Sequence, residues 1–320
     1  MNTSVSNDPE YSIIIPIYNE EEVLPSLLPE IVERMDALGR AYEVVVIDDG
    51  STDGSWNILQ SFAAQYGSLE AYRLLRNFGH QKALYSGLHV ARGKAIGVMD
   101  GDGQDPIEVL IEMFDLWGRG YDVIYGVRRK RKENILKKSS YFIFYRLYRR
   151  MANIDIALDS GDFCVMDRKV VDFIVALQDS SPFIRGLRSW YGGRQLGLEY
   201  DRLARQKGEP KYTLFKLIDL AINGLTSFSK EPLRWAVYFG GAVSVFTFIF
   251  LAAIVIAKLC FNYPESSISA GWASAISLTS FIGGVNIMLL GLIGEYIMHI
   301  FESVKHRPAF LIQESTRKDN

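Results

Sequence analysis

The sequence predicts an α/β protein in which helices cover both faces of a mostly parallel sheet, followed by interfacial amphipathic helices and two transmembrane helices. Three observations lead to this prediction. The first 127 residues alternate apolar runs with helical patterns, as expected of a parallel sheet covered on both faces. Acidic clusters follow two of these runs. Two long runs without charged residues lie near the carboxyl end.

The predicted elements alternate regularly along the first part of the chain. The expected strands are 11–18, 43–48, a strand through Leu74 and Leu75 to Arg76, 95–99 and 122–127. The expected helices are 21–38, Thr52 to about Tyr66, about 81–91, and one that begins just after Pro106.

Composition narrows the class of protein. The 320 residues are 48% hydrophobic, which is enough for one large domain or two smaller ones. A mean hydropathy of +0.06 is unusual for a soluble enzyme, so apolar sequence must be concentrated somewhere. Cys164 and Cys260 are the only cysteines, which provides no disulfide framework or zinc spacing and fits a reducing compartment. Residues 1–9 lack the apolar core of a signal peptide, so we expect a cytoplasmic catalytic domain.

The runs without charged residues are 235–257 and 266–294. Each run exceeds the ~20 residues that a helix needs to cross a bilayer, which predicts two transmembrane helices. A pair of buried core helices is the alternative. Lys230 and Arg234 precede the first run and basic residues follow the second, so the positive-inside rule places both termini in the cytoplasm. Glu295 is expected at the cytoplasmic edge of the second helix, where its carboxylate reaches water.

A domain organisation follows from these runs. We expect a cytoplasmic catalytic domain over 1–210, a juxtamembrane amphipathic helix over 211–232, two transmembrane helices within 233–300 at about 235–257 and 273–298, and a cytoplasmic tail over 301–320.

The acidic clusters are Asp48-Asp49-Gly50-Ser51 and Asp100-Gly101-Asp102. Open α/β sheets bind ligands at the carboxyl ends of their strands, where both clusters are expected. A D-x-D pair is suited to hold a divalent metal against a diphosphate, because alternate residues share a face. The pattern predicts a nucleotide-sugar site. A turn with a helix cap at Ser51 or Thr52 is compatible with it.

Other nucleotide and metal sites are excluded by the same segments. The first predicted strand is followed by Asn19-Glu20 and not by a glycine-rich dinucleotide fingerprint, and no Walker loop occurs. The loop that starts at Asp100 lacks the glycine and glutamate of an EF-hand, because Asp105 and Ile111 occupy those positions.

Four motifs end successive predicted strands: P-x-Y-N-E, D-D-G-S-T-D, R-N-F-G and D-G-D-x-Q-D-P. Their order and spacing resemble the family 2 glycosyltransferases of GT-A fold. With the two apolar runs, nearly the whole chain is similar to the polyprenyl-phosphate branch of that family, which includes dolichyl-phosphate mannose synthase and bactoprenol glucosyltransferases.

The resemblance implies a role for each motif. A nucleotide-binding role is implied for Pro16, Tyr18, Glu20, Asp48, Asp49 and Asp100. A catalytic role is implied for Asp100, Asp102, Gln104 and Asp162. Asp102, supported by Asp100, is the expected ligand of Mg²⁺ or Mn²⁺. A plain loop residue is the alternative for Gln104, and a turn-capping carboxylate is the alternative for Asp162.

Basic residues are expected to bind phosphate, and the candidates are Arg128, Arg202, Arg205 and Lys211. The segment 205–212 resembles the family's R-x-x-G-x-S-K-Y pattern. Pro210 stands where Ser is usual, which leaves the backbone geometry and one hydroxyl contact open.

Basic and aromatic residues interleave over 134–152, which predicts an amphipathic helix at the membrane surface. Nucleic-acid binding is the competing interpretation, and the neighbouring apolar runs favour the membrane. A second interfacial helix is expected over 213–228, with packing against a partner helix, including oligomerisation, as its alternative. The histidines form no ligand spacing and are expected to be structural or surface residues: His80, His89, His299 and His306.

The resemblance implies an inverting transfer of a hexose, preferably glucose from UDP-glucose, to polyprenyl (undecaprenyl) phosphate. The acceptor phosphate, with a second pKa of about 6, is already an anionic nucleophile, so positioning matters more than a strong base. GDP-mannose or a modified pentose as donor, a processive polysaccharide synthase and a lipid-linked scaffold stay open. We expect a multi-pass protein of the plasma (inner) membrane that forms homo-oligomers and binds no nucleic acid.

Overall fold

The computed structural model describes residues 9–129, 160–179, 182–202, 268–305 and 307–317, together with short helical stretches between residues 237 and 256. The chain divides into two compact units. The first comprises Met1–Tyr145, Ile154–Tyr212 and His306–Asn320, and the second comprises Arg146–Asn153 and Thr213–Lys305.

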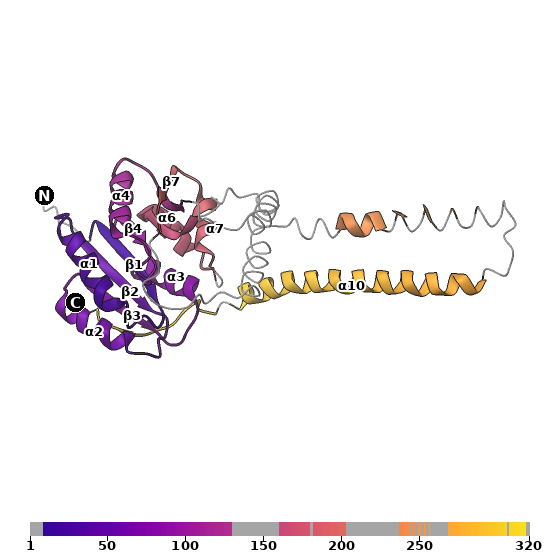
Figure 1. The fold of residues 1–320 in the computed structure, drawn as a ribbon, viewed down its shortest axis with the longest axis horizontal. Coiled ribbons are helices and arrows are strands. Elements are labelled where there is room, and N and C mark those ends of the chain that lie inside the picture. The colour runs from indigo at the N-terminus through magenta and orange to yellow at the C-terminus, as the bar shows by residue number, and fades with distance from the viewer. Residues whose placement is uncertain are drawn as a thin grey trace. The chain divides into compact units, whose positions relative to one another are not determined.

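A sheet forms the centre of the first unit (Figure 1). Among the described residues it has eight strands, in the order β7-β5-β6-β4-β1-β2-β3-β8. The strands are β1 (Tyr11–Ile17), β2 (Tyr42–Asp48), β3 (Leu69–Leu74), β4 (Ala95–Val98), β5 (Val123–Arg128), β6 (Ser160–Asp167), β7 (Gln195–Tyr200) and β8 (Ile312–Ser315). Strands β1 to β4 are parallel, as are β5 and β7. Strands β6 and β8 are antiparallel to their neighbours. The predicted α/β class with a mostly parallel sheet is confirmed.

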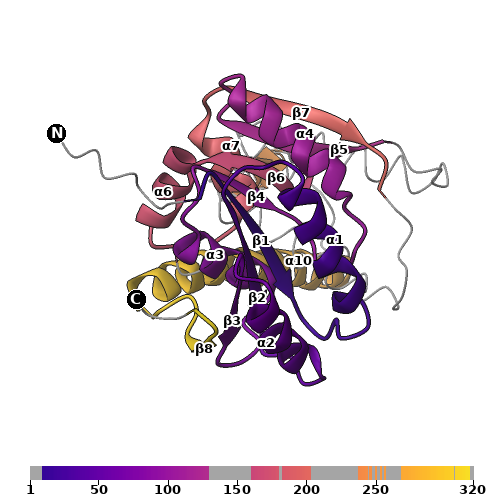
Figure 2. The same cartoon turned by 90° about the vertical axis from the view of Figure 1, so that its left-hand side faces the viewer.

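Helices cover both faces of the sheet, as Figure 2 shows. One face carries α1 (Leu24–Asp36), α2 (Ser55–Gln65) and α4 (Ile107–Gly118). The other carries α3 (His80–Val90), α6 (Arg168–Ala176) and α7 (Ile184–Tyr191). Because both faces are covered, all seven residues of β1 are buried.

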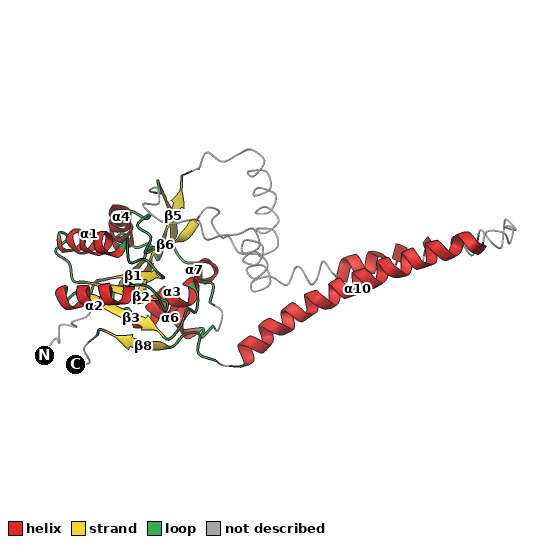
Figure 3. Cartoon of the chain, turned by 60° about the horizontal axis from the view of Figure 1, so that its bottom comes forward, coloured by secondary structure: helices red, strands yellow, loops and turns green. Residues whose placement is uncertain are grey.

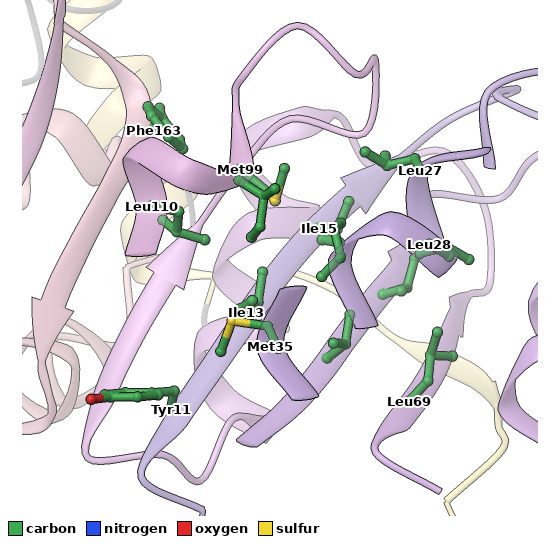
Figure 4. Close-up of a cluster of buried hydrophobic side chains, with 14 of the residues drawn as sticks. Tyr11, Ile13, Ile15, Leu27, Leu28, Met35, Leu69, Met99, Leu110 and Phe163 are labelled. Carbon is green, nitrogen blue, oxygen red and sulfur yellow. The ribbon is translucent and has the colours of Figure 1, made fainter. Parts of the chain in front are cut away.

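A cluster of buried hydrophobic side chains lies between the sheet and the helices α1, α2 and α4 (Figure 4). Ile13 and Ile15 of β1 point into it and meet Leu28 and Met35 of α1. These residues recur at helical spacing along α1 and at alternate positions along β1, as the sequence pattern requires. Burial of such side chains provides roughly 25 cal/mol per Å² of apolar surface.

Several predicted boundaries shift in the structure. Strand β3 ends at Leu74, so the prediction of a strand to Arg76 was wrong. The Leu75 amide donates to the Leu311 carbonyl oxygen at 2.9 Å, and the chain then leaves the sheet. Helix α2 begins at Ser55 with Gly54 at its N-cap, so a cap at Ser51 or Thr52 was also wrong.

Residues 160–200 and 312–315, for which the sequence predicts no elements, form β6, α6, α7, β7 and β8 in the structure. Strand β8 covers the edge of β3, and Glu314 accepts a hydrogen bond from Trp56 Nε1 at 3.1 Å (Figure 3). The tail therefore belongs to the fold of the first unit.

The second unit contains α10 (Ile268–Val304). In the part of the chain that the structure describes, α10 alone is long and apolar enough to cross a membrane, with a mean hydropathy of 1.7 over Phe281–Met298. The expected second span at 273–298 lies within it. Ten of the 23 residues of the first expected span at 235–257 lie outside the described residues, so a count of two spans stays a prediction. The predicted interfacial helices at 134–152 and 211–232 also lie outside them.

A buried acidic residue is expected to stabilise the amino-terminal end of the sheet. Glu43 of β2 is 3% exposed, and its carboxylate accepts hydrogen bonds from Ser12 Oγ at 2.6 Å and from Arg92 N, Nε and Nη2 at 2.6, 2.9 and 2.6 Å. Glu43→Gln replaces one acceptor oxygen by a donor facing other donors. We expect it to lower the free energy of unfolding by about 2 kcal/mol, measured by urea unfolding in detergent.

Glu108→Gln is the matched control. Its ion pair with Arg34 is more than half exposed on both sides, with side-chain exposures of 57% and 55%. A change below about 0.5 kcal/mol is expected for such a pair. Equal losses of stability in the two variants would contradict the assignment of Glu43 as a structural anchor.

Candidate active site

The carboxyl ends of β1, β2 and β4 lie at the same end of the sheet, where antiparallel β6 begins. Ile17 of β1 pairs with Asp48 of β2. Val98 of β4 pairs with Cys164 of β6, and continuing this antiparallel register by two residues brings Asp100 opposite Asp162. The topology therefore gathers residues that are far apart in the sequence.

The first and second motifs bind each other. The Asn19 amide donates to Ser51 Oγ at 2.9 Å, the Thr52 amide to Asn19 Oδ1 at 2.8 Å, and the Glu20 amide to Ser55 Oγ at 3.0 Å. Asn19 adopts a positive φ of 54°, which asparagine tolerates better than most residues. These contacts fix the loop after β1, which contains Tyr18 and Glu20, against the loop after β2.

Glycines let the second motif approach the third, and the fourth approach the first. Gly50 has a φ of +70°, and a Cβ there would lie 2.6 Å from the Arg76 carbonyl carbon. A Cβ at Gly101 would lie 2.5 Å from Ile17 Cγ2 and 3.1 Å from the carbonyl oxygen of Pro16. Larger residues at either position would separate the strand ends.

Asp48 and Asp49 are both buried and bind the backbone. Asp48 Oδ1 accepts from the Ser51 amide at 2.8 Å. The two oxygens of Asp49 accept from the amides of Phe78 and Gly79 at 2.7 and 2.9 Å. Burial raises the pKa of both carboxyls, and these hydrogen bonds oppose the rise. Whether they also contact a nucleotide stays a prediction.

Three carboxylates follow β4 and surround one cation. Arg202 Nη2 lies 3.0 Å from Asp100 Oδ2 and 3.4 Å from Asp102 Oδ2, and Arg202 Nε lies 3.4 Å from Asp105 Oδ1. Burial, and next the negative charge of Asp105, raises the pKa of Asp100 to about 6. Gln104 is buried beside them, and its backbone amide donates to Asp102 Oδ1 at 3.1 Å.

Asp162 of β6 is the centre of a second charged group. Arg185 of α7 donates to both of its oxygens, from Nε and Nη2, at 2.8 Å each. Gln81 Nε2 donates to Oδ2 at 3.0 Å, and His80 Nε2 lies 3.2 Å from the same oxygen. Burial alone would raise the pKa of Asp162, but Arg185 and His80 hold it well below its usual range. His80 Nε2 is also 3.7 Å from Asp100 Oδ1, so it joins the two groups.

Two of the four predicted phosphate-binding residues, Arg128 and Arg202, lie in the part of the chain that the structure describes. Arg128 ends β5 and pairs in register with Tyr200 of β7, so Arg128 and Arg202 belong to the same edge of the sheet. Arg205 and Lys211 lie outside the described residues.

Residues 12–174 match the family model "Glycosyl transferase family 2". The chain belongs to this family. The uncharacterised glycosyltransferase YkcC of Bacillus subtilis is 41% identical to it over 312 residues, which cover 97% of this chain and 95% of that protein. The SfII prophage-derived bactoprenol glucosyl transferase of Shigella flexneri is 35% identical over 307 residues, covering 96% and 98%.

A prophage bactoprenol glucosyl transferase homolog of Escherichia coli is 34% identical over 303 residues, covering 94% of this chain and 98% of that protein. The solved mannosyltransferase PcManGT from Pyrobaculum calidifontis, in complex with GDP-Man and Mn²⁺, aligns at 16% identity with a TM-score of 0.49, over 93% of this chain and 88% of that one. Family membership agrees with the four strand-end motifs, and the expected GT-A fold is confirmed.

Sequence reasoning missed several residues of this family 2 glycosyltransferase site. His80 was expected to be structural or on the surface, yet it lies between Asp100 and Asp162. Its position directly after the R-N-F-G motif was the available signal. Asp105, next to the D-G-D segment, had a similar signal. Arg185 had none, because only the packing of α7 beside β6 brings it to Asp162.

The described side chains of this glycosyltransferase supply few ligands for a metal ion, so a bound substrate and water would have to supply the others. Within the described ranges, no group of three or more His, Cys, Asp or Glu side chains could hold a metal ion. Mg²⁺ in phosphate-transfer sites commonly uses one or two carboxylates and completes its shell with phosphate oxygens and water. Asp100 and Asp102 already share the positive charge of Arg202, so this pair fits such a cation.

Proposed function

We propose that this family 2 glycosyltransferase moves a hexose, preferably glucose from UDP-glucose, to polyprenyl phosphate with inversion at the anomeric carbon. The observation that carries the proposal is the convergence of Asp100, Asp102 and Asp162, with their arginines, at one edge of the sheet. Relatives that match nearly the full length of the chain are named bactoprenol glucosyl transferases, which supports the lipid acceptor. GDP-mannose is the alternative donor.

Mg²⁺ or Mn²⁺ is the proposed cofactor, held by Asp102 with Asp100. When bound, such an ion neutralises charge on the departing nucleoside diphosphate. The protein's own cations contribute to the same end. Arg202 reaches both carboxylates, and Arg128 ends the neighbouring strand β5. We propose that both bind phosphate, together with Arg205 and Lys211.

The remaining residues are proposed to orient the substrates. The candidate nucleoside-binding residues lie at the ends of β1 and β2 or in the loops that follow, and these loops bind each other: Pro16, Tyr18, Glu20, Asp48 and Asp49. Asp162 stays ionised because Arg185 holds it, so it is suited to accept hydrogen bonds from sugar hydroxyls. The acceptor phosphate is itself the nucleophile, so alignment contributes most to the rate.

Membrane attachment is the last part of the proposal. The apolar length of α10 supports a transmembrane helix, and we propose a second span at 235–257, with the domain boundaries, cytoplasmic termini and plasma (inner) membrane location expected from the sequence. A homo-oligomer is proposed as well. Such an arrangement gives the catalytic domain access to a donor in water and an acceptor in the bilayer.

The proposal is tested by transfer of radiolabel from a panel of nucleotide sugars to undecaprenyl phosphate, with the full chain in detergent. We expect a chloroform-extractable product from UDP-glucose that is labile to mild acid and stable to mild base. EDTA should abolish transfer, and added Mg²⁺ or Mn²⁺ should restore it. Water-soluble polymer would support a processive synthase instead. Absence of metal-dependent transfer from every donor would overturn the proposal.

A further inference from the structure

Two arginines bind carboxylates in this site, and they do so differently. Arg185 approaches Asp162 with Nε and Nη2, one for each oxygen, at 2.8 Å each. This is the bidentate geometry of strong arginine–carboxylate pairs. Arg202 instead shares the single nitrogen Nη2 between Asp100 at 3.0 Å and Asp102 at 3.4 Å. The Arg185–Asp162 contact fixes the relative orientation of the two side chains. The Arg202 contact mainly offsets the negative charge of Asp100 and Asp102.

A second nitrogen of the Arg202 guanidinium, Nε, also lacks the close contact that Arg185 makes. Arg202 Nε is buried and makes no hydrogen bond with any residue that the structure describes, although it lies 3.4 Å from Asp105 Oδ1. A buried donor without a hydrogen bond is unfavourable. The guanidinium is therefore held in this position mainly by the negative charge around it.

The acidic segment does not depend on Arg202 for its shape. Asp105 Oδ1 accepts from the Tyr200 hydroxyl at 2.8 Å, and Asp105 Oδ2 accepts from the Asp100 amide at 3.4 Å. Asp102 Oδ1 accepts from the Gln104 amide at 3.1 Å. Removal of Arg202 would thus leave the loop bound through its own contacts, with one oxygen of Asp100 and one of Asp102 facing the vacated position.

We propose that Arg202 occupies the cation position of the D-G-D segment when no metal is bound, and that the divalent cation displaces it. A divalent cation and the guanidinium would compete for these two oxygens, because like charges a few ångströms apart repel in a partly buried site. Binding of the metal and release of the guanidinium are then one equilibrium. This inference rests on the proposed metal site and adds a competitor for it within the chain.

Once the metal has displaced it, the Arg202 guanidinium has a second role. A freed guanidinium beside the metal is suited to pair with phosphate, which either substrate supplies. Arg202 in this sense offsets part of the negative charge of the acidic segment until the metal arrives and then offers its own charge to a phosphate. Metal binding would thereby prepare the site for phosphate.

The exchange is tested by Mn²⁺ binding to the full chain in detergent, without nucleotide, followed by electron paramagnetic resonance of free Mn²⁺. Removal of the competitor in Arg202→Ala should tighten Mn²⁺ binding by about tenfold. Arg202→Lys keeps a cation and should remain within about threefold of the wild type. Arg129→Ala is the control, because Arg129 is 59% exposed and pairs with Glu199 and Asp201 instead. Its Mn²⁺ affinity should not change.

Kinetics add a readout that a structural defect would not produce. Arg202→Ala should transfer sugar more slowly although it binds metal more tightly. A raised KM for undecaprenyl phosphate alone would assign the released guanidinium to the acceptor, and a raised KM for the nucleotide sugar alone would assign it to the donor diphosphate. An unchanged KM for both would overturn the second role.

The measurements separate a failure of the exchange between Arg202 and the metal from a failure of the proposed function. If wild-type protein binds Mn²⁺ and Arg202→Ala binds it equally or more weakly, the exchange is overturned while the proposed function stands. If neither protein binds Mn²⁺, the metal site and the exchange fall together. If Mn²⁺ binding behaves as expected but no sugar is transferred, the exchange stands and the proposed function is overturned.

Discussion

Asp102→Asn is expected to reduce glycosyl transfer at least about 100-fold while the protein remains folded. Asparagine keeps the oxygen that accepts from the Gln104 amide, so the loop should hold its shape. It removes the negative charge that, with Asp100, would hold the metal against the diphosphate. The measurements are initial rates over a Mg²⁺ titration and thermal unfolding in detergent.

Asp201→Asn is the matched control for this variant. The Asp201 side chain is 76% exposed and pairs only loosely with Arg129, at 3.5 Å. Its rate and its Mg²⁺ dependence should equal those of the wild type. If Asp102→Asn keeps more than half of the wild-type rate at every Mg²⁺ concentration, Asp102 is not the metal ligand.

The second large effect is expected at the pair of Asp162 and Arg185. The carboxylate of Asp162 is 3% exposed, and Arg185 neutralises it. Either Asp162→Asn or Arg185→Gln leaves one partner without its opposite charge, which should lower the free energy of unfolding by about 3 kcal/mol. The double variant should lose less than the sum of the single losses, by about 1 to 3 kcal/mol, because the partners compensate each other.

Activity separates the two interpretations of Asp162. If its charge orients a substrate, both variants that lack Asp162 stay inactive, whatever stability they keep. If Asp162 only caps and packs, the activity of each variant follows its stability. Urea unfolding and radiolabel transfer on the same four proteins decide between these outcomes. Additive stability losses would show that the bidentate contact contributes little.

The strand-end motifs illustrate what could be predicted. Continuous apolar runs such as Ile13 to Ile15 occur where a strand is buried on both faces, and the acidic residues that end β2 and β4 had to lie at the carboxyl edge of a parallel sheet. Local pattern carries this information, because a strand or a helix is a property of neighbouring residues.

The antiparallel strand β6 illustrates what could not. Its apolar residues alone give no direction or neighbour, and only its insertion between β4 and β5 brings Asp162 opposite Asp100. The same holds for Arg185, which reaches Asp162 through the packing of α7, and for β8, whose partner β3 is more than two hundred residues earlier. Pairings of this kind depend on the long-range arrangement of the chain.

The sequence by itself determined the α/β class, the parallel centre of the sheet and the acidic strand ends, because hydrophobic periodicity and turn chemistry act over short distances. The tertiary structure alone decided which charges meet: His80 and Arg185 at Asp162, and Arg202 across Asp100 and Asp102. Electrostatic pairing acts through space, so the partner of a carboxylate follows from the fold and not from its neighbours in the chain.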